Sequence, residues 1–358
     1  MNKIEVKTSE LTSIMEAIKP VATTNLTEDA SSFAFHNSTV IAKNNSCLLS
    51  IDFDHPFTNM ILPYTKFNEL ITKIPQDKMI RLSESDSNLE IAFNTGKKIK
   101  TTASIPCMAS QLSLITSEEL LPPLESETRK VPTNFIEGLK MCSDTLPRES
   151  LNFAMTLYSV QDDTVTSSDE ARLSRYQMDT GLGMDFLISR DNANIIIASN
   201  FDECCAYENS IIFIGSDRIA RFALPTEKYP EIKDDIFTGE DPVEVSFTTK
   251  QIISALERSI LFSEGSSDMA KIATLYIKPI DYKIATSNEF GQNVEIGKAK
   301  ANLAEPIFMK INPVYLLQIL KLVGKNSSIK AVICKHRSGF KVIFHAPNFK
   351  FVLASWNM

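Results

Sequence analysis

Apolar residues recur along the chain in a pattern that predicts six helices. In each helical segment they return every three or four positions, as on the buried face of an amphipathic helix. The first set of segments is 8–19, 132–144 and 249–262, and the second is 63–74, 189–200 and 312–323. Within each set the segments lie about 120 residues apart, which is too long for a solenoid repeat and is the length of a domain. The pattern therefore predicts three similar domains, at residues 1–125, 126–244 and 245–358.

Between these helices the chain contains short runs rich in β-branched and aromatic residues, separated by Asn, Ser and Gly turns. Residues 32–36, 47–53 and 153–160 are examples. Acidic, proline-containing segments at 117–127 and 238–242 mark the expected linkers. Each domain should then hold two helices and roughly six to eight mainly antiparallel strands, an α+β fold.

Composition places the chain among ordinary globular proteins, with 43% hydrophobic and 23% charged residues in 358. Six cysteines without a C-x-x-C pair and four scattered histidines give no zinc pattern, so reduced and mostly buried thiols are expected. The N-terminal residues include no apolar stretch of a signal peptide, and no run of about 18 apolar residues occurs. A cytoplasmic location is the resulting expectation.

Enzyme motifs are incomplete wherever part of one occurs. Thr95-Gly-Lys-Lys98 lacks the earlier glycine of a phosphate loop, and Gly181-Leu-Gly183 lacks the third glycine of a dinucleotide turn. Ser327-Ser-Ile-Lys330 has Ser-x-x-Lys spacing without its companion motifs. Combined with threefold repetition, this favours a non-catalytic scaffold without cofactor or metal.

The predicted helices carry more positive charge than the rest of the chain. Their eight basic and seven acidic residues total +1, whereas the whole chain has a net charge of −7. Twelve such helices, two from each domain of a dimer, would close a circle about 35 Å across, wide enough for a duplex of about 20 Å. Contacts with DNA would then be weak, water-mediated and independent of sequence. The eight basic residues are Lys19, Lys66, Lys73, Lys140, Arg190, Lys250, Arg258 and Lys321.

Several stretches make the chain similar to a known family. They are Arg148-Glu-Ser-Leu-Asn152, Thr166–Leu173, Lys228-Tyr-Pro-Glu-Ile232, Ile311-Asn-Pro-Val-Tyr315 and Phe349–Met358. Together they resemble the bacterial sliding clamp, the β subunit of DNA polymerase III, over essentially the whole chain. The resemblance implies a head-to-tail homodimer that closes as a ring around double-stranded DNA, without a cofactor, in the nucleoid. It also adds Arg148 to the DNA-facing residues.

The resemblance further implies a pocket for short Gln-Leu-x-Leu-Phe-like peptides of polymerases and clamp-loader subunits. Where the family usually has Thr-Asp-Gly-His-Arg-Leu, this chain has Ser168-Asp-Glu-Ala-Arg-Leu173, and Asp234 and Asp235 replace a basic and an apolar residue. The rim is thus expected to select an unusual partner motif. The implied lining is Leu151, Ser168, Glu170, Ala171, Arg172, Leu173, Pro230, Asn312, Tyr315, Val352, Leu353, Ala354, Ser355, Trp356, Asn357 and Met358.

Two further features follow from the resemblance. Gln111-Leu-Ser-Leu-Ile115 is similar to a partner peptide, and it is interpreted either as a structural turn or as a self-competing ligand. The dimer contact is expected to join an apolar part of the third domain to a basic edge strand of the first. Its residues are Ile74, Lys97, Lys98, Lys100, Ile260, Leu261 and Glu295.

Three functions are compatible with these patterns. The first is a processivity clamp that tethers the replicative polymerase and other DNA-processing proteins. The second is a divergent clamp of a phage or mobile element with its own client protein. The third is a three-domain enzyme in which the repetition is coincidental.

Overall fold

The computed structural model describes residues 2–23, 31–94, 100–108, 127–324, 326–336 and 339–356. Within them one order of elements occurs three times: a strand, a helix, four strands, a second helix and three strands. The first copy consists of β1 (Lys3–Lys7), α1 (Thr8–Ala22), β2 (Ser32–His36), β3 (Thr39–Lys43), β4 (Cys47–Asp52), β5 (Met60–Pro63), α2 (Tyr64–Thr72), β6 (Met79–Ser85), β7 (Asn88–Asn94) and β8 (Lys100–Pro106).

The second and third copies follow the same order. The second consists of β9 (Arg129–Lys130), α4 (Phe135–Cys142), β10 (Leu157–Gln161), β11 (Thr164–Ser168), β12 (Arg172–Gln177), β13 (Asp185–Ser189), α5 (Arg190–Ala198), β14 (Glu203–Tyr207), β15 (Ser210–Ile214) and β16 (Arg218–Ala223). The third consists of β17 (Glu240–Thr248), α6 (Thr249–Leu261), β18 (Ala273–Ile277), β19 (Asp281–Asn288), β20 (Gly291–Ala301), β21 (Ile307–Ile311), α7 (Pro313–Val323), β22 (Ser328–His336), β23 (Gly339–Ala346) and β24 (Phe349–Ala354). The boundary predicted between residues 244 and 245 falls inside β17.

Strand pairing repeats together with the elements. In every copy the first strand and the last three form one set of neighbouring strands. The orders are β1-β6-β7-β8, β9-β14-β15-β16 and β17-β22-β23-β24. In the first and third copies the middle strands form a second set, β5-β2-β3-β4 and β21-β18-β19-β20. The pairings are antiparallel, as expected for strands joined by short turns.

Two junctions join strands of neighbouring copies. The fourth strand of the first copy, β4, pairs with the last strand of the second, β16, where Ile51 lies opposite Arg218. The same rule joins β12 to β24, where Arg172 lies opposite Leu353. At the two ends of the series, β20 is the fourth strand of the third copy and β8 is the last strand of the first copy. These are the positions that the rule would join to a further copy. In the described part of the chain β8 pairs with β7 alone, so its other edge is open.

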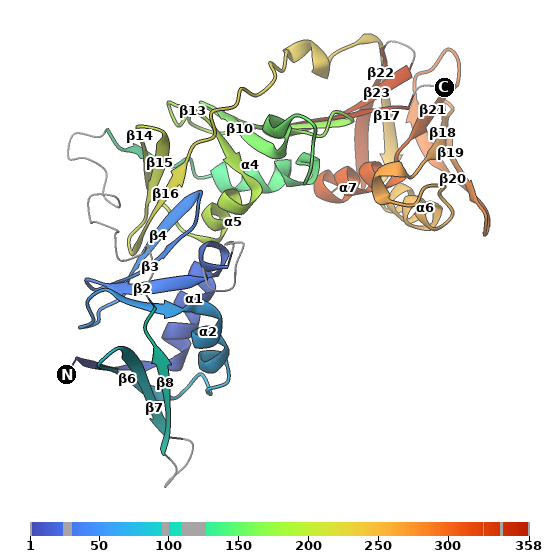
Figure 1. The fold of residues 1–358 in the computed structure, drawn as a ribbon. Helices are drawn as coiled ribbons and strands as arrows, with labels where there is room; N and C mark the ends of the chain where they lie inside the picture. Colours follow the sequence, from blue (N-terminus) through green and yellow to red (C-terminus); the bar gives the residue numbers. More distant parts are fainter. Residues whose placement is uncertain are drawn as a thin grey trace. The chain divides into compact units, whose positions relative to one another are not determined.

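The chain divides into two compact units, each with its own sheets and helices (Figure 1). The first unit, Met1–Thr133 with Leu182–Thr226, contains α1, α2 and α5. The second, Asn134–Gly181 with Glu227–Met358, contains α4, α6 and α7. The strands of the second unit follow the order β10-β11-β12-β24-β23-β22-β17-β20-β19-β18-β21.

The core of the first unit lies where α1 and α2 pack together and α1 covers β3 and β4. Phe33 and Phe67 are fully buried there, with ring centroids 5.0 Å apart in an edge-to-face arrangement. In the second unit α6 packs on α7, β19 and β20. Full burial of each such large apolar side chain contributes about 1.5–3 kcal/mol to folding.

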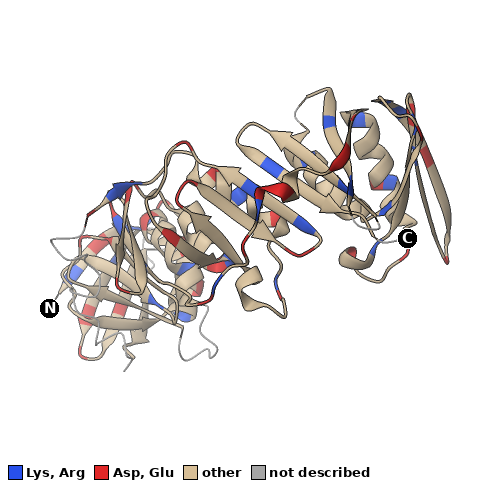
Figure 2. Ribbon diagram, turned by 90° about the horizontal axis from the view of Figure 1, so that it is seen from above, with Lys and Arg blue, Asp and Glu red and all other residues tan. Residues whose placement is uncertain are grey.

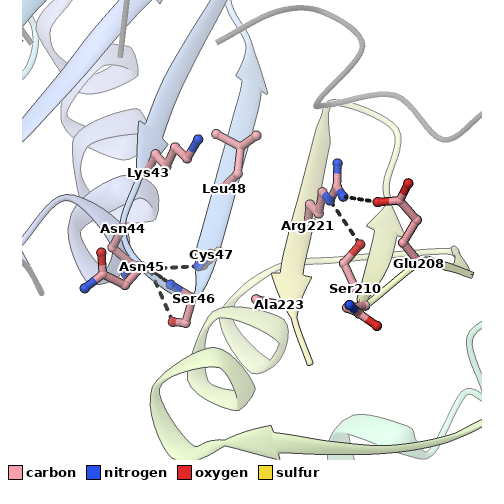
Figure 3. A pocket seen from close by; sticks show the side chains of 11 residues that line it. Lys43, Asn44, Asn45, Ser46, Cys47, Leu48, Glu208, Ser210, Arg221 and Ala223 are labelled. Atoms are coloured by element: carbon pink, nitrogen blue, oxygen red, sulfur yellow. Dashed lines mark hydrogen bonds and ion pairs between the residues drawn. The ribbon is translucent and has the colours of Figure 1, made fainter. Parts of the chain in front are cut away.

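The junction between β4 and β16 borders a hollow of about 240 Å³ on the first unit. Figure 3 shows Lys43 and Leu48 on one side of it and Arg221 with Glu208 on the other. Arg221 donates from Nε to Ser210 Oγ at 3.0 Å and lies 3.8 Å from Glu208. Its charge is therefore already partnered within the sheet.

The six helices predicted from apolar spacing are confirmed, with ends within three residues of the predicted ones. The strand predicted at 153–160 is wrong in its first half. Residues Phe153–Thr156 form the 3-10 helix η4, because the side chain of Asn152 accepts a hydrogen bond from the Ala154 N–H and caps a helical turn. The α+β fold with antiparallel sheets is confirmed.

Candidate functional site

The loop between β11 and β12 lies beside the C-terminal strand β24, although about 180 residues separate them in the chain. Leu173 is directly opposite Val352, and the Ala354 N–H donates to the carbonyl oxygen of Ala171 at 2.9 Å. Tertiary structure therefore brings together the two main parts of the predicted peptide pocket. Both belong to the second unit.

The β11–β12 loop is a tight, hydrogen-bonded turn. Ser168 Oγ donates to the Arg172 carbonyl at 2.7 Å, and Asp169 Oδ1 accepts from the Arg172 N–H at 2.7 Å. Glu170, at the tip, has a φ of 70°. This left-handed conformation is readily adopted by glycine, the residue usual in the family at this position. Glu170 thus keeps the turn at a cost in strain, while its exposed side chain adds a negative charge to the rim.

Arg172 is a buried connector of this region. Its guanidinium pairs with Asp169 at 2.7 Å, donates from Nη1 to Gln318 Oε1 at 2.6 Å, and lies 3.6 Å from the centroid of the Tyr315 ring. Only 8% of Arg172 is exposed. We therefore assign it a positioning role in the lining that the resemblance implies. Gln318 and Asp169 were not among the predicted site residues. Gln318 is 146 residues from Arg172 and no local pattern links the two, whereas Asp169, three residues before Arg172, could have been indicated by its place in the same turn.

Asn312 is also a structural residue. Its Oδ1 accepts from the N–H groups of Val314 and Tyr315 and so caps α7, which begins at Pro313. Its Nδ2 donates to the carbonyl oxygens of Asp268 and Met269 at 2.9 and 3.2 Å. Asn312 therefore ties η6 (Asp268–Ala270) to the start of α7. Burial is the larger cause, and the nearby Asp169 carboxylate the smaller one, of a raised pKa at the Tyr315 hydroxyl. The hydroxyl therefore stays neutral.

The apolar residues Leu173 and Val352 lie in a cluster beneath the chain's own segment 228–238. Phe237, together with Ile232 and Ile236 of that segment, packs against them. Salt bridges and hydrogen bonds hold the segment in place. Arg175 donates to the Ile232 carbonyl and pairs with Asp234, and the buried Lys341 Nζ donates to the carbonyls of Asp235 and Ile236. Asp234, where the family is basic, is thus the partner of Arg175.

Other predicted lining residues differ strongly in exposure. Leu353 is completely buried in the described chain. Leu151 is fully exposed and Trp356 is 44% exposed. The Trp356 N–H donates to the Lys310 carbonyl at 2.9 Å, which fixes this last described residue against β21. Phe153 is 55% exposed and close in sequence to Leu151, but it was not among the predicted lining residues.

The remaining lining residues complete the rim. Ala354 and Ser355 are partly buried, Pro230 and Ala171 are exposed, and Ser355 Oγ accepts from the Phe340 N–H at 2.7 Å. Asn357, Met358 and residues 111–115 lie outside the described residues.

Seven of the nine predicted DNA-facing cations lie on the six helices. Lys73 directly follows α2, and Arg148 follows η3 (Ser143–Thr145). All are exposed except the half-buried Arg190. Two are partly neutralised, since Arg258 pairs with Glu295 and Lys321 with Glu257, each at 2.7 Å. Figure 2 shows basic and acidic positions interspersed along the chain. Any attraction to phosphate would therefore be local and weak.

The predicted dimer residues also differ in exposure. Ile74 is only 2% exposed and packs inside the first unit. Leu261 is 71% exposed, Ile260 is partly buried, and Glu295 is held by Arg258, which lowers its pKa. Lys97 and Lys98 lie outside the described residues, and of Lys100 only the backbone, at the start of β8, is described.

Metal and membrane sites were also sought in the described residues. No group of three or more His, Cys, Asp or Glu side chains is arranged to hold a metal ion there. Among the described helices, none has the length and apolar character needed to cross a membrane. Five of the six free cysteines are buried, which confirms the expectation of mostly buried thiols.

No family model matches the sequence, and no curated protein matches it significantly. Solved structures match over the whole chain. The DNA polymerase III subunit β of Pseudomonas aeruginosa has a TM-score of 0.79 and 13% identity, covering 99% of this chain and 100% of its own. A DNA polymerase sliding clamp of the same species has 0.81 and 12%, and the sliding clamp of Bartonella birtlesii, bound to griselimycin, has 0.83 and 16%, each covering 100% of both chains.

The chain therefore has the three-domain fold of DNA sliding clamps. Two of the solved structures named above are β subunits of bacterial DNA polymerase III, and their sequences are 13% and 16% identical to this chain.

Proposed function

We propose that this protein is a sliding clamp, a non-catalytic processivity factor that encircles duplex DNA and tethers polymerases and other DNA-processing proteins. The observation that carries the proposal is the threefold order of elements, in which each copy is joined to the next by the same strand pairing. Repetition with one constant junction is the property that lets identical parts close into a ring. The protein would act in the cytoplasm, on the nucleoid, and would need no cofactor.

Closure of the ring is proposed to use the two strands left over by the junction rule. β4 pairs with β16 and β12 with β24, so β20 of one chain would pair with β8 of a second chain. Because β17 pairs only with the Ala299–Ala301 end of β20, the rest of that edge is left for a partner strand. A head-to-tail dimer of this kind covers it together with the open edge of β8 and gives six copies around the ring. Leu261, at the end of α6, and the basic start of β8 would take part in this contact.

DNA would be held by topology, with little help from charge. Of the nine proposed channel cations, Arg258 pairs with Glu295 and Lys321 with Glu257, which reduces the charge offered to phosphate. Weak contacts to phosphate leave a clamp free to move along the duplex. Binding should therefore be independent of DNA sequence and should require circular DNA, which has no free end from which the ring can slide off.

Partner proteins are proposed to dock at the rim formed by the β11–β12 loop, the start of α7 and the C-terminal residues around Trp356. Short Gln-Leu-x-Leu-Phe-like segments suit such a site, because an exposed indole offers a large apolar surface for a leucine or phenylalanine anchor. The acidic Glu170 at the rim favours a partner segment with a basic residue near its anchor.

Retention on DNA tests the proposal directly. Labelled protein is loaded onto a nicked circular plasmid with the clamp loader of its own organism and ATP, and then separated by gel filtration. We expect co-elution with circular DNA and loss after a restriction enzyme linearises the plasmid. Equal retention on linear DNA would reject a topological clamp in favour of simple DNA binding.

A further inference from the structure

One face of the sheet β20-β19-β18-β21 is covered by the chain, and the other is open. α6 packs on β19 and β20, and the buried residues of β18 and β21 alternate with less buried ones. Leu275 and Met309 belong to the buried set. Neighbouring residues in a strand point to opposite faces, so Tyr276 and Phe308 lie on the open face.

The strand register arranges the open face in rows. The central row runs across all four strands, because Phe308 is opposite Tyr276, Tyr276 opposite Lys283, and Lys283 opposite Ile296. Directly opposite residues have neighbouring side chains on the same face. The row is thus apolar apart from Lys283, whose long side chain can place its charge at the border and its methylenes in the row.

Two outer rows border this central row. One contains Lys310, Thr274, Ala285 and Val294, which are opposite one another in turn. The other contains Lys298 opposite Asp281, with Lys278 just after the end of β18.

The central row is exposed and hollowed. Ile296 is 72% and Phe308 42% exposed, and Val294 in the outer row is 53% exposed. A hollow of about 580 Å³ lies over the row and is lined by Tyr276, Lys283, Ile296 and Phe308 among others. An open apolar groove of this kind on a protein surface usually marks an interaction site.

Charge on this face is opposite to that of the protein as a whole. It carries Lys278, Lys283, Lys298 and Lys310 against Asp281, while the chain has a net charge of −7. None of these four lysines forms an ion pair with a described residue. A partner should therefore bring acidic groups to both borders.

We propose that this face binds an acidic amphipathic helix of a partner protein, with the helix lying along the central row. Thr274 of β18 and Lys278, just after the end of the strand, are four residues apart, so the lysine-bearing rows are separated by about 13 Å. A helix with its side chains is about 10–12 Å wide and fits between them. Its apolar stripe would enter the hollow and its flanking carboxylates would meet the lysines.

A single-stranded nucleic acid fits this face less well. Stacking of bases needs open aromatic faces. The Tyr276 ring has Lys278 Nζ 5.5 Å from its centroid, and Phe308 meets it edge-on at 6.5 Å. The other exposed apolar side chains are aliphatic, which suits leucines better than bases.

Fluorescence anisotropy with the full-length protein tests the proposal. The probe is a fluorescein-labelled synthetic helix with leucines on one face and glutamates on both sides of them. We expect saturable binding. The affinity should fall about tenfold in Phe308→Ser and in the double variant Lys278→Glu/Lys310→Glu, which is the size of effect seen when a central residue of an interface is removed. Raising the salt concentration should weaken it further.

Matched changes elsewhere control for general effects. Met79→Ser and Lys130→Glu alter an exposed apolar and an exposed basic residue of the first unit and should leave the affinity unchanged. An excess of unlabelled Gln-Leu-x-Leu-Phe peptide, or Trp356→Ala, should also leave it unchanged, so failure here is distinct from failure of the proposed clamp pocket. The proposal would be overturned if wild type and Phe308→Ser bound the probe with equal affinity, or if oligo(dT) or a lysine-flanked probe bound more strongly. It would also be overturned if Phe308→Ser affected dimerisation alone.

Discussion

The guanidinium carbon of Arg172 lies 3.6 Å from the centroid of the Tyr315 ring, and this contact joins the β11–β12 loop to α7. Arg172 comes from the second copy of the element order and Tyr315 from the third. The same guanidinium pairs with Asp169, whose side chain is only 4% exposed. One buried charge therefore sets the geometry of the proposed partner site.

Arg172→Ala should destabilise the protein strongly. Removal of the guanidinium leaves the buried Asp169 carboxylate without its partner, and loss of one member of a buried pair costs about 3–5 kcal/mol. Urea unfolding would measure this. As a control, Arg81→Ala removes a largely exposed pair with Glu5 and should cost less than about 1 kcal/mol. Similar losses in the two variants would contradict the structural role of Arg172.

Trp356→Ala should separate partner binding from stability. Its side chain is 44% exposed, so truncation should weaken binding of a Gln-Leu-x-Leu-Phe peptide by about tenfold, as for an interface anchor, with little change in Tm. Leu353→Ala is the contrasting variant. Leu353 is fully buried and should cost about 2–5 kcal/mol in unfolding free energy. Unchanged peptide affinity in Trp356→Ala would remove this residue from the site.

Glu170→Gly should restore an unstrained loop. Glycine adopts a φ of 70° without steric cost, while its greater freedom in the unfolded chain opposes the gain. We expect an increase in unfolding free energy of less than about 1 kcal/mol. Loss of the negative charge should also weaken preference for peptides with a basic flank, measured by anisotropy on paired peptides. An unaltered preference would show that Glu170 does not select partners.

Leu261→Asp should prevent ring closure. An exposed leucine at the end of α6 would become a charge facing the proposed β8–β20 contact. Light scattering should then give a mass near the 40.0 kDa of one chain, against twice that value for wild type. Ile280→Asp changes an equally exposed residue in the β18–β19 turn and should leave the dimer intact. A dimeric Leu261→Asp protein would argue against this contact.

Stability should fall on mild acidification because of His55. Burial lowers the pKa of His55 from its ordinary value of 6.5, and its imidazole lies between the Thr39 carbonyl and the Phe57 N–H. Protonation therefore favours the unfolded chain, and the contribution of His55 is complete above pH 6.5 and declines below it.

Urea unfolding of wild type and His55→Gln between pH 7.5 and 5.5, a range about one unit either side of an unperturbed histidine, measures this contribution. The stability difference between the two proteins should shrink as the pH falls. His345, whose pKa is lowered by burial and by Lys350, remains in both proteins and cancels in the comparison. A difference that stays constant with pH would contradict the assignment.

The helices and most strands could be predicted from the sequence because their pattern is local. Burial of Leu11, Met15 and Ile18 on one side of α1 follows directly from three- and four-residue spacing. The prediction failed at Phe153–Thr156, where capping by the Asn152 side chain outweighs strand-like composition. The near-complete burial of Ile74 could not be predicted either, since a residue's exposure depends on what the rest of the chain packs against it.

The sequence by itself determined that the chain repeats three times, because periodicity and apolar spacing are properties of neighbouring residues. Only the tertiary structure decided how the copies join and which site residues are open. The pairing of Leu173 with Val352, the covering of both by Phe237, and the contact of Arg172 with Tyr315 link residues far apart in the chain. Such contacts arise from packing between elements, and no local pattern encodes them.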